Sequence, residues 1–185
     1  MGAMPLRLVP VSGRHARDIQ HLASDEAMAR WTTIPHPYPP DGALAFVERA
    51  QRLRARGEHE TFAICETTRC LGVAVLVRDA AAPDRAELGC WIGRPYWGRG
   101  YATAAARQLL AYGFGRMDLD VIVARCFVAN RASARVIEKL GFRFVRLEVS
   151  QNPKWPAEPV RRYELTYRDW RRESAASISV SASVG

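Results

Sequence analysis

The sequence predicts a mixed α/β fold, α+β in type, with a largely antiparallel central sheet and helices on both faces. Three observations lead to this prediction. Short apolar runs typical of strands recur along the chain, and two of them, Glu60 to Glu66 and Cys70 to Arg78, are separated by only a few residues, as in a hairpin. Segments with helical spacing of apolar residues lie between such runs. A glycine-rich turn joins one strand-like run directly to a helix-like segment.

In the first part of the chain, Leu6 to Val11 predicts a strand and Arg14 to Trp31 predicts one helix. Four prolines interrupt Thr32 to Pro40, which we expect to be a loop. Asp41 is placed to cap the next helix. The apolar run from Cys70 shows little polar alternation, which indicates a strand covered on both faces.

The second part alternates strands with helices. We expect one helix directly after the glycine-rich turn and a second from Asn130 to Leu140, with Gly141 as its left-handed C-terminal cap. The remaining runs predict four strands, at Ala86 to Gly93, Val121 to Val128, Phe142 to Val149 and Val160 to Tyr167.

The length of 185 residues suits one domain, which we assign to residues 5–173. Residues 174–185 are small and serine-rich, so we expect a flexible tail. The opening Met1-Gly2-Ala3-Met4 has the appearance of an expression remnant and is excluded from the fold prediction.

The composition restricts partners and location. A formal net charge of +8 attracts anions, but the arginines are spread along the chain, which favours a mildly basic surface over a nucleic-acid-binding tract. The longest apolar run, Cys70 to Val77, is too short to cross a bilayer, and the N-terminus lacks a signal-peptide pattern. We expect a cytoplasmic protein with no membrane partner. The four cysteines and four histidines show no metal-ligand spacing, so no metal is predicted.

The segment Trp97-Gly98-Arg99-Gly100-Tyr101-Ala102 is the glycine-rich turn. Glycines let consecutive main-chain N–H groups point at one anion, and the following helix adds unpaired donors and the positive end of its dipole. This pattern favours a phosphate site, although such a turn also serves simply to pack a strand against a helix. The third-glycine position of a dinucleotide fingerprint holds Thr103, and no Gly-Lys-Ser/Thr follows, so Rossmann and Walker sites are excluded.

Two separated motifs occur in a fixed order. The segment from Glu87 to Thr103 is followed by Asn130-Arg-Ala-Ser133 and by Glu138-Lys-Leu-Gly-Phe142. Together they resemble the GNAT acyltransferase superfamily, and most closely its ribosomal-protein alanine and serine N-acetyltransferase branch. The resemblance implies a sheet with a V-shaped splay between two central strands, and acetyl-CoA as co-substrate.

The resemblance also implies which residues bind coenzyme A. Main-chain amides from Gly98 to Thr103 would hold the pyrophosphate, and the strand ending at Trp91 and Ile92 would pair with the pantetheine arm. Asn130 would hydrogen-bond the pantetheine, although it also suits a plain N-cap. The implied cofactor-binding set is Trp91, Ile92, Trp97, Gly98, Arg99, Gly100, Tyr101, Ala102, Thr103 and Asn130.

Two residues are candidates for catalysis. Strand alternation places Glu87 on one face with Gly89 and Trp91, where a partly buried carboxylate would suit a general base. A solvated strand-end carboxylate and a water chain as the base are the alternatives. By resemblance Ser133 would stabilise or protonate the leaving thiolate, and its alternative is a solvent-facing first-turn residue.

Three positions depart from the family pattern. Ile137 stands where many members have Tyr, Cys90 where this branch often has Tyr, and Ala104 where it often has Glu. The loss of the usual Tyr increases the reliance on Ser133. Cys90 has no histidine nearby in sequence to activate it, which favours a packed thiol over an acyl-carrying nucleophile.

The predicted function is therefore transfer of an acetyl group from acetyl-CoA directly to a primary amine, either a protein N-terminus or a small amine. A coenzyme A-binding regulatory protein with the same fold and no turnover is the alternative. The sequence leaves the acceptor, the acyl-chain preference and the choice between monomer and homodimer open.

Overall fold

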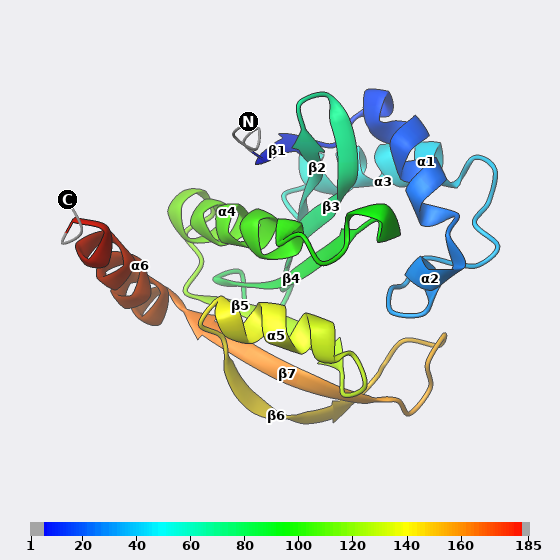
Figure 1. Cartoon of the computed structure of the whole chain (residues 1–185). Coiled ribbons are helices and arrows are strands. Elements are labelled where there is room, and N and C mark those ends of the chain that lie inside the picture. The colour runs from blue at the N-terminus through cyan, green and yellow to red at the C-terminus, as the bar shows by residue number, and fades with distance from the viewer. Residues whose placement is uncertain (1–5, 183–185) are drawn as a thin grey trace.

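The computed structural model describes residues 6–182. A seven-stranded sheet with the order β1-β2-β3-β4-β5-β7-β6 forms its centre (Figure 1). Neighbouring strands are antiparallel except β4 and β5, which are parallel. The strands are β1 (Leu6–Pro10), β2 (His59–Glu66), β3 (Arg69–Arg78), β4 (Arg85–Ile92), β5 (Val121–Phe127), β6 (Arg143–Val149) and β7 (Pro159–Thr166). The predicted mixed, largely antiparallel sheet is confirmed.

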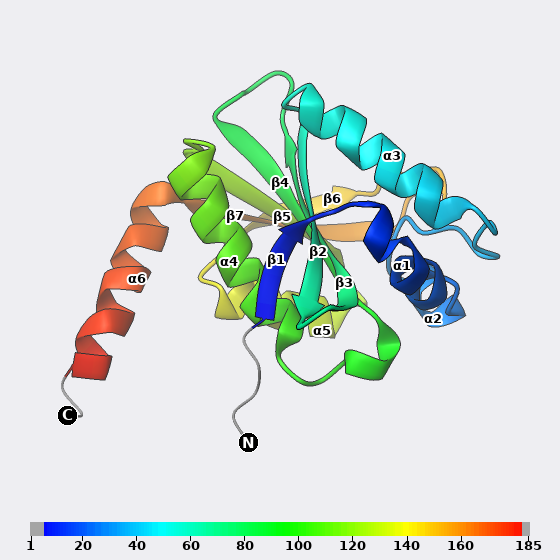
Figure 2. The same cartoon turned by 90° about the horizontal axis from the view of Figure 1, so that it is seen from above.

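Helices cover both faces of the sheet, as Figure 2 shows from above. On one face lie α1 (Ala16–Ala23) and α3 (Gly42–Ala55), which pack on β3 and β2. On the other lie α4 (Tyr101–Arg116) and α5 (Arg131–Lys139), which pack on β4 and β5. The remaining helices are α2 (Glu26–Ala29), α6 (Tyr167–Ala182) and the 3-10 turns η1 (Gly13–His15) and η2 (Arg94–Tyr96).

Each face of the sheet has its own apolar core. Along β2, Phe62 and Ile64 belong to the core under α4, whereas Ala63 and Cys65 belong to the core under α1 and α3. This alternation is the two-residue period of a strand. Strand β3 contributes to both cores, as its unbroken apolar run predicts.

The segment from Arg14 to Trp31 is not the single helix that its periodicity predicts. It divides into η1, α1 and α2, and the break falls at Ser24 and Asp25. The Ser24 hydroxyl donates to the Gln20 carbonyl at 2.7 Å, and the Asp25 carboxylate accepts from the Ala27 N–H at 2.9 Å. Serine and aspartate compete for main-chain groups in this way, so one helix ends and the next begins between them.

The start of α3 also differs from the prediction. Asp41 occupies the N-cap position but its side chain accepts no capping hydrogen bond. Instead, the Ala43 N–H donates to the side-chain carbonyl of Gln20 at 3.1 Å. A residue of α1 thus supplies the cap, which fixes α3 against α1.

The parallel pairing of β4 and β5 is short. It runs from Arg85 opposite Val121 to Leu88 opposite Ala124 and then stops, although both strands continue. Residues 89–92 of β4 and 125–127 of β5 therefore diverge, and we call the gap between them the splay. The V-shaped opening that the resemblance implies is present.

The C-terminal part of the chain forms the far edge of the sheet and a terminal helix. Edge strand β6 exposes Phe144, Val145, Leu147 and Val149. An exposed apolar edge is compatible with the expected monomer or homodimer, and this expectation stays a prediction. Helix α6 continues to Ala182, so the tail expected to be flexible from residue 174 is helical up to that residue; its flexibility stays a prediction. Residues 1–4, which we excluded as a remnant, and residues 183–185 lie outside the described range.

Between residues 6 and 182, the structure contains no helix with the length and apolar character needed to span a membrane. The cytoplasmic location stays a prediction.

Candidate active site

A cavity of about 1590 Å³ follows the splay. Its walls come from β4, β5, the glycine-rich turn, the first turns of α5, the loop after α2, and α3. With one exception, Arg99, the residues that the sequence predicts for the site all line this cavity: Glu87, Trp91, Ile92, Trp97, Gly98, Gly100, Tyr101, Ala102, Thr103, Asn130 and Ser133. The fold therefore brings two distant motifs to one place.

The glycine-rich turn has the backbone that an anion site needs. Gly98 and Gly100 have φ angles of 75° and 80°, in the left-handed region that favours glycine, and α4 begins at the next residue, Tyr101. A Cβ at either position would meet no atom within 4 Å, so the space in front of the turn is open. The unpaired N–H groups of the first turn of α4 face this space. These features fit a pyrophosphate.

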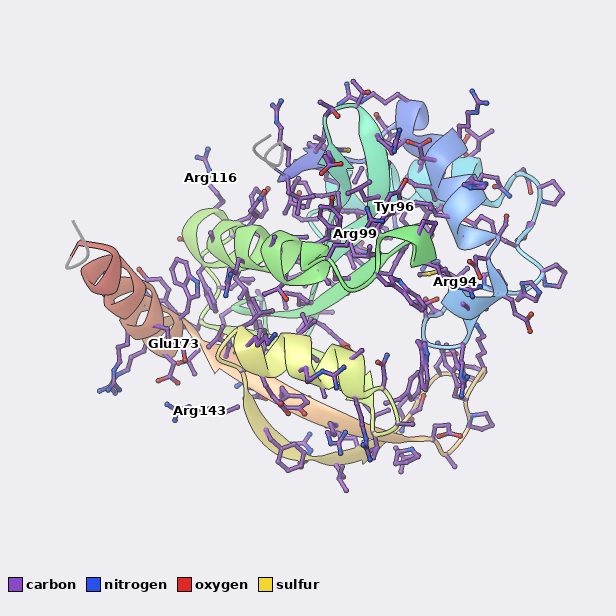
Figure 3. All side chains as sticks on the ribbon, in the orientation of Figure 1. Arg94, Tyr96, Arg99, Arg116, Arg143 and Glu173 are labelled. Atoms are coloured by element: carbon purple, nitrogen blue, oxygen red, sulfur yellow. The ribbon has the colours of Figure 1, made fainter. Side chains whose placement is uncertain are left out.

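The side chains of the turn fix it to the sheet or face outward. The Tyr101 hydroxyl donates to the Glu66 carboxylate at 2.8 Å, which anchors the start of α4 to the end of β2 and raises the pKa of the phenol. Arg99 is exposed on the turn between Tyr96 and α4 (Figure 3). It does not line the cavity, and its contact with a bound ligand stays a prediction.

The hydrogen-bond direction of β4 decides which main-chain groups face the splay. The Gly93 N–H donates to the Leu71 carbonyl at 2.8 Å. In an antiparallel pair these bonds alternate, so Trp91 also bonds to β3, and the main chain of Cys90 and Ile92 faces the splay. The Trp97 indole N–H donates to the Ile92 carbonyl and occupies it.

The structure therefore corrects the expectation that the main chain of Trp91 pairs with the pantetheine arm. Its main-chain groups belong to the β3 pairing, and only its side chain lines the cavity. The N–H groups of Cys90 and Ile92 and the carbonyl of Cys90 take its place as the edge that an extended ligand would meet. Burial raises the pKa of the Cys90 thiol to about 12, which keeps it protonated at neutral pH and favours a packing role.

Asn130 and Ser133 lie at the start of α5 and both line the cavity. The Asn130 side-chain carbonyl accepts from the Ser133 N–H at 3.0 Å, so Asn130 is an N-cap, and its side-chain NH₂ has no partner among residues 6–182. Burial raises the pKa of the Cys126 thiol, and the charge of Arg161 and the nearby Ser133 side chain oppose this shift. Ser133 is half-buried in the cavity wall, and its role in catalysis stays a prediction.

Glu87 lies where the splay begins, one residue before the β4–β5 pairing ends. It shares a face with Trp91, and Leu88 and Cys90 lie on the opposite face, as strand alternation predicts. Burial raises the pKa of the Glu87 carboxyl, and the Arg125 guanidinium, which donates to its Oε2 atom, opposes this shift. The Oε1 atom has no hydrogen-bond partner in the described part of the chain. This atom is therefore available to accept a proton.

Arg125 is a site residue that the sequence does not reveal. Besides Glu87, it binds Glu148 of β6, with 2.9 Å between its Nε atom and the carboxylate. No spacing in the sequence predicts that β4, β5 and β6 contribute to one ion-pair network.

Three aromatic side chains, Trp31, Phe127 and Trp155, also line the cavity. The ring centroids of Trp31 and Phe127 are 6.3 Å apart, and those of Phe127 and Trp155 are 4.9 Å apart.

Comparisons with known proteins identify the family. The family model described as an acetyltransferase (GNAT) domain matches residues 5–143, most of the chain. The chain belongs to the GNAT acetyltransferase family. It is accordingly an acetyl-CoA-dependent N-acyltransferase, and within residues 6–182 no group of three or more His, Cys, Asp or Glu side chains is arranged to hold a metal ion.

Relatives of this acetyltransferase include FsC-acetyl coenzyme A-N(2)-transacetylase of Aspergillus fumigatus. It is 24% identical over 187 residues, which cover 95% of this chain and 80% of the relative. Among solved structures, Mycobacterium smegmatis RimJ in complex with CoA-disulfide has a TM-score of 0.80 at 22% identity, and covers 95% of this chain and 90% of its own. The ribosomal L7/L12 α-N-protein acetyltransferase RimL has a TM-score of 0.76 at 17% identity, with 88% and 94% covered.

A second kind of structural neighbour acts on a small amine. Spermidine N-acetyltransferase from Vibrio cholerae, in complex with CoA and spermine, has a TM-score of 0.75 at 19% identity, with 89% of this chain and 97% of that chain covered. At these identities the structural neighbours show the shared fold alone. The predicted resemblance to a family that includes ribosomal-protein acetyltransferases is confirmed.

The left-handed backbone at Gly100 gives the first prediction. Gly100→Ala places a side chain in open space, so its main effect is to disfavour the observed φ by about 1–2 kcal/mol. We expect the affinity for coenzyme A, measured by calorimetry, to fall about tenfold. Gly115→Ala is the matched control, since Gly115 lies within α4, has open space around it and has no positive φ. Equal affinities for the two variants would contradict a phosphate site on the turn.

Proposed function

We propose that this acetyltransferase transfers the acetyl group directly to a primary amine, either a protein N-terminus or a small amine. The observation that supports this function is the position of Glu87 and Ser133 in one cavity. Glu87 lies where the splay begins, and Ser133 lies on the helix that follows β5. A base and a hydroxyl donor on two sides of an extended binding edge suit acyl transfer from a thioester to an amine.

Binding of acetyl-CoA depends on main-chain groups. The amides from Gly98 to Thr103 bind the pyrophosphate, and the Cys90 and Ile92 edge pairs with the pantetheine arm. The free NH₂ of Asn130 donates to the same arm. Arg135 and Lys139 of α5 also line the cavity and add positive charge near the phosphates. Bound acetyl-CoA supplies an acetyl group activated as a thioester.

Glu87 acts as the general base. Its Oε1 atom accepts a proton from the amine as the nitrogen–carbon bond forms, directly or through one water. Arg125 holds the carboxylate through Oε2 and so fixes the orientation of Oε1. The raised pKa brings the carboxylate closer to the basicity that proton transfer requires near neutral pH.

Ser133 stabilises the sulfur that leaves when the carbon–sulfur bond breaks. Ile137, which replaces the Tyr of many relatives, is buried in the core under α4 and cannot serve this purpose. The Ser133 hydroxyl is a donor at the start of α5, and its residue lines the cavity.

The reaction is tested by thiol release. With acetyl-CoA and a panel of peptides beginning with Ala, Ser or Met, polyamines and aminoglycosides, we expect release that depends on the amine. Ser133→Ala should lower kcat roughly 10²-fold with little change in acetyl-CoA affinity. Ser24→Ala, at the end of α1 and outside the cavity, is the control. Tight binding of acetyl-CoA without amine-dependent release would instead support a coenzyme A-binding regulatory protein.

The pH dependence of kcat/KM tests Glu87. The ammonium form of the acceptor must lose one proton before it reacts, so a plot of log kcat/KM against pH has a slope of one. Below the pKa of the Glu87 carboxyl a second proton must leave, and the slope steepens to two. Burial places this point above the ordinary glutamate value. Arg125→Gln removes the opposing cation and should move the point to higher pH, whereas Glu87→Gln should leave a slope of one. A slope of two that persists in Glu87→Gln would exclude Glu87 as the base.

A further inference from the structure

The described part of the cavity wall has no carboxylate without an arginine partner. Its carboxylates are Glu87 and Glu148, and Arg125 binds both. Glu148 is also bound by Arg146 at 2.6 Å and lies 3.5 Å from Arg162. An acceptor with several ammonium groups would therefore find no unpaired carboxylate along this wall.

Arg49 of α3 provides the opposite charge. Its side chain lines the cavity and is exposed to it, and no carboxylate of residues 6–182 lies within ion-pair distance. By contrast, Arg52 on the same helix lies 3.9 Å from Glu48 and is not part of the cavity wall. Arg49 is thus a cation of the wall that is available to a ligand.

His59 lies beside Arg49 and adds a neutral polar group. It lines the cavity, and burial together with the nearby Arg49 charge lowers its pKa. The ring makes no hydrogen bond within the described residues. A neutral imidazole can donate one hydrogen bond, so Arg49 and His59 together offer a charge and a second donor to an anion.

The sheet register gives the separation between this pair and the base. His59 is opposite Val77, and Val77 is opposite Glu87, so the three lie in one row across β2, β3 and β4. Adjacent strands are about 4.8 Å apart, which places the Cα atoms of His59 and Glu87 roughly 10 Å from each other. The row faces the cavity along its length.

We propose that the acceptor is a primary amine that also carries an anionic group, a carboxylate or a phosphate, roughly 10 Å from the amine. The anionic group binds Arg49 and His59 while the amine lies beside Glu87. This inference rests on the proposed function, and it names the class of acceptor. It disfavours polyamines, because a second ammonium group would lie near Arg49.

The test uses acceptors that differ in one group. The peptide amides Ala-Ala-X-NH₂, with X as Glu, phosphoserine, Gln or Lys, share the reacting amine and carry their third side chain within about 10 Å of it. We expect kcat/KM for the Glu or the phosphoserine peptide to exceed that for Gln about tenfold, with Lys lowest. Comparison of Glu with phosphoserine distinguishes a carboxylate from a phosphate. Spermidine should be a poor acceptor.

Variants assign the preference to one side chain. Arg49→Gln should remove the difference between the Glu and Gln peptides, Arg49→Lys should retain part of it, and the control Arg52→Gln should leave it unchanged. Equal rates for Glu and Gln peptides in the unmodified protein, or a preference that survives in Arg49→Gln, would overturn the inference and leave the proposed function standing. No thiol release with any peptide or amine, despite acetyl-CoA binding, would overturn both.

Discussion

The early end of the β4–β5 pairing is the constraint on which the site depends. The two parallel strands share only the register from Arg85 and Val121 to Leu88 and Ala124. Beyond this point each strand is held by its other neighbour, β3 or β7, and the main-chain groups between them have no strand partner. Such groups need hydrogen bonds from a ligand or water. The rest of the sheet supports both sides of the splay, which suits the binding edge that we propose.

The glycine-rich turn completes this edge at the end where β4 gives way to α4. Left-handed Gly98 and Gly100 direct main-chain N–H groups outward, and Tyr101 anchors the turn to Glu66 of β2. The indole N–H of Trp97 donates to the carbonyl of Ile92, the last residue of β4. The edge and the turn are thus two neighbouring sets of main-chain groups, separated by residues 93–97, in which the N–H groups of Gly93, Tyr96 and Trp97 are bonded within the protein.

The charged residues of the cavity wall differ in whether they are already paired. Arg125 pairs with carboxylates of β4 and β6 in one partly exposed network. The network leaves one oxygen of Glu87 without a partner among the described residues, and Arg49 lies outside the network; in our proposal these two groups meet the acceptor. In the proposed binding mode, selectivity for the acceptor depends on which charges of the cavity wall are already paired, as well as on the shape of the cavity.

Most of the strands and the phosphate turn could be predicted from the sequence, because apolar periodicity and paired glycines are local signals. The break at Ser24 and Asp25 was less visible, since capping side chains interrupted a helical pattern that continued on both sides. Non-local features could not be predicted. The Arg125 pairs require the order and register of four strands, β4, β5, β7 and β6. The direction of the Trp91 main chain depends on which Leu71 and Gly93 atoms pair.

Hydrogen exchange of individual amides tests the central claim most directly. With coenzyme A bound, the amides of Cys90, Ile92 and residues 98–103 should exchange more slowly, whereas the Trp91 amide, already bonded to β3, should change little. Protection confined to other parts of the chain, with unchanged exchange at Cys90, Ile92 and the turn, would contradict the account of the splay as the binding edge.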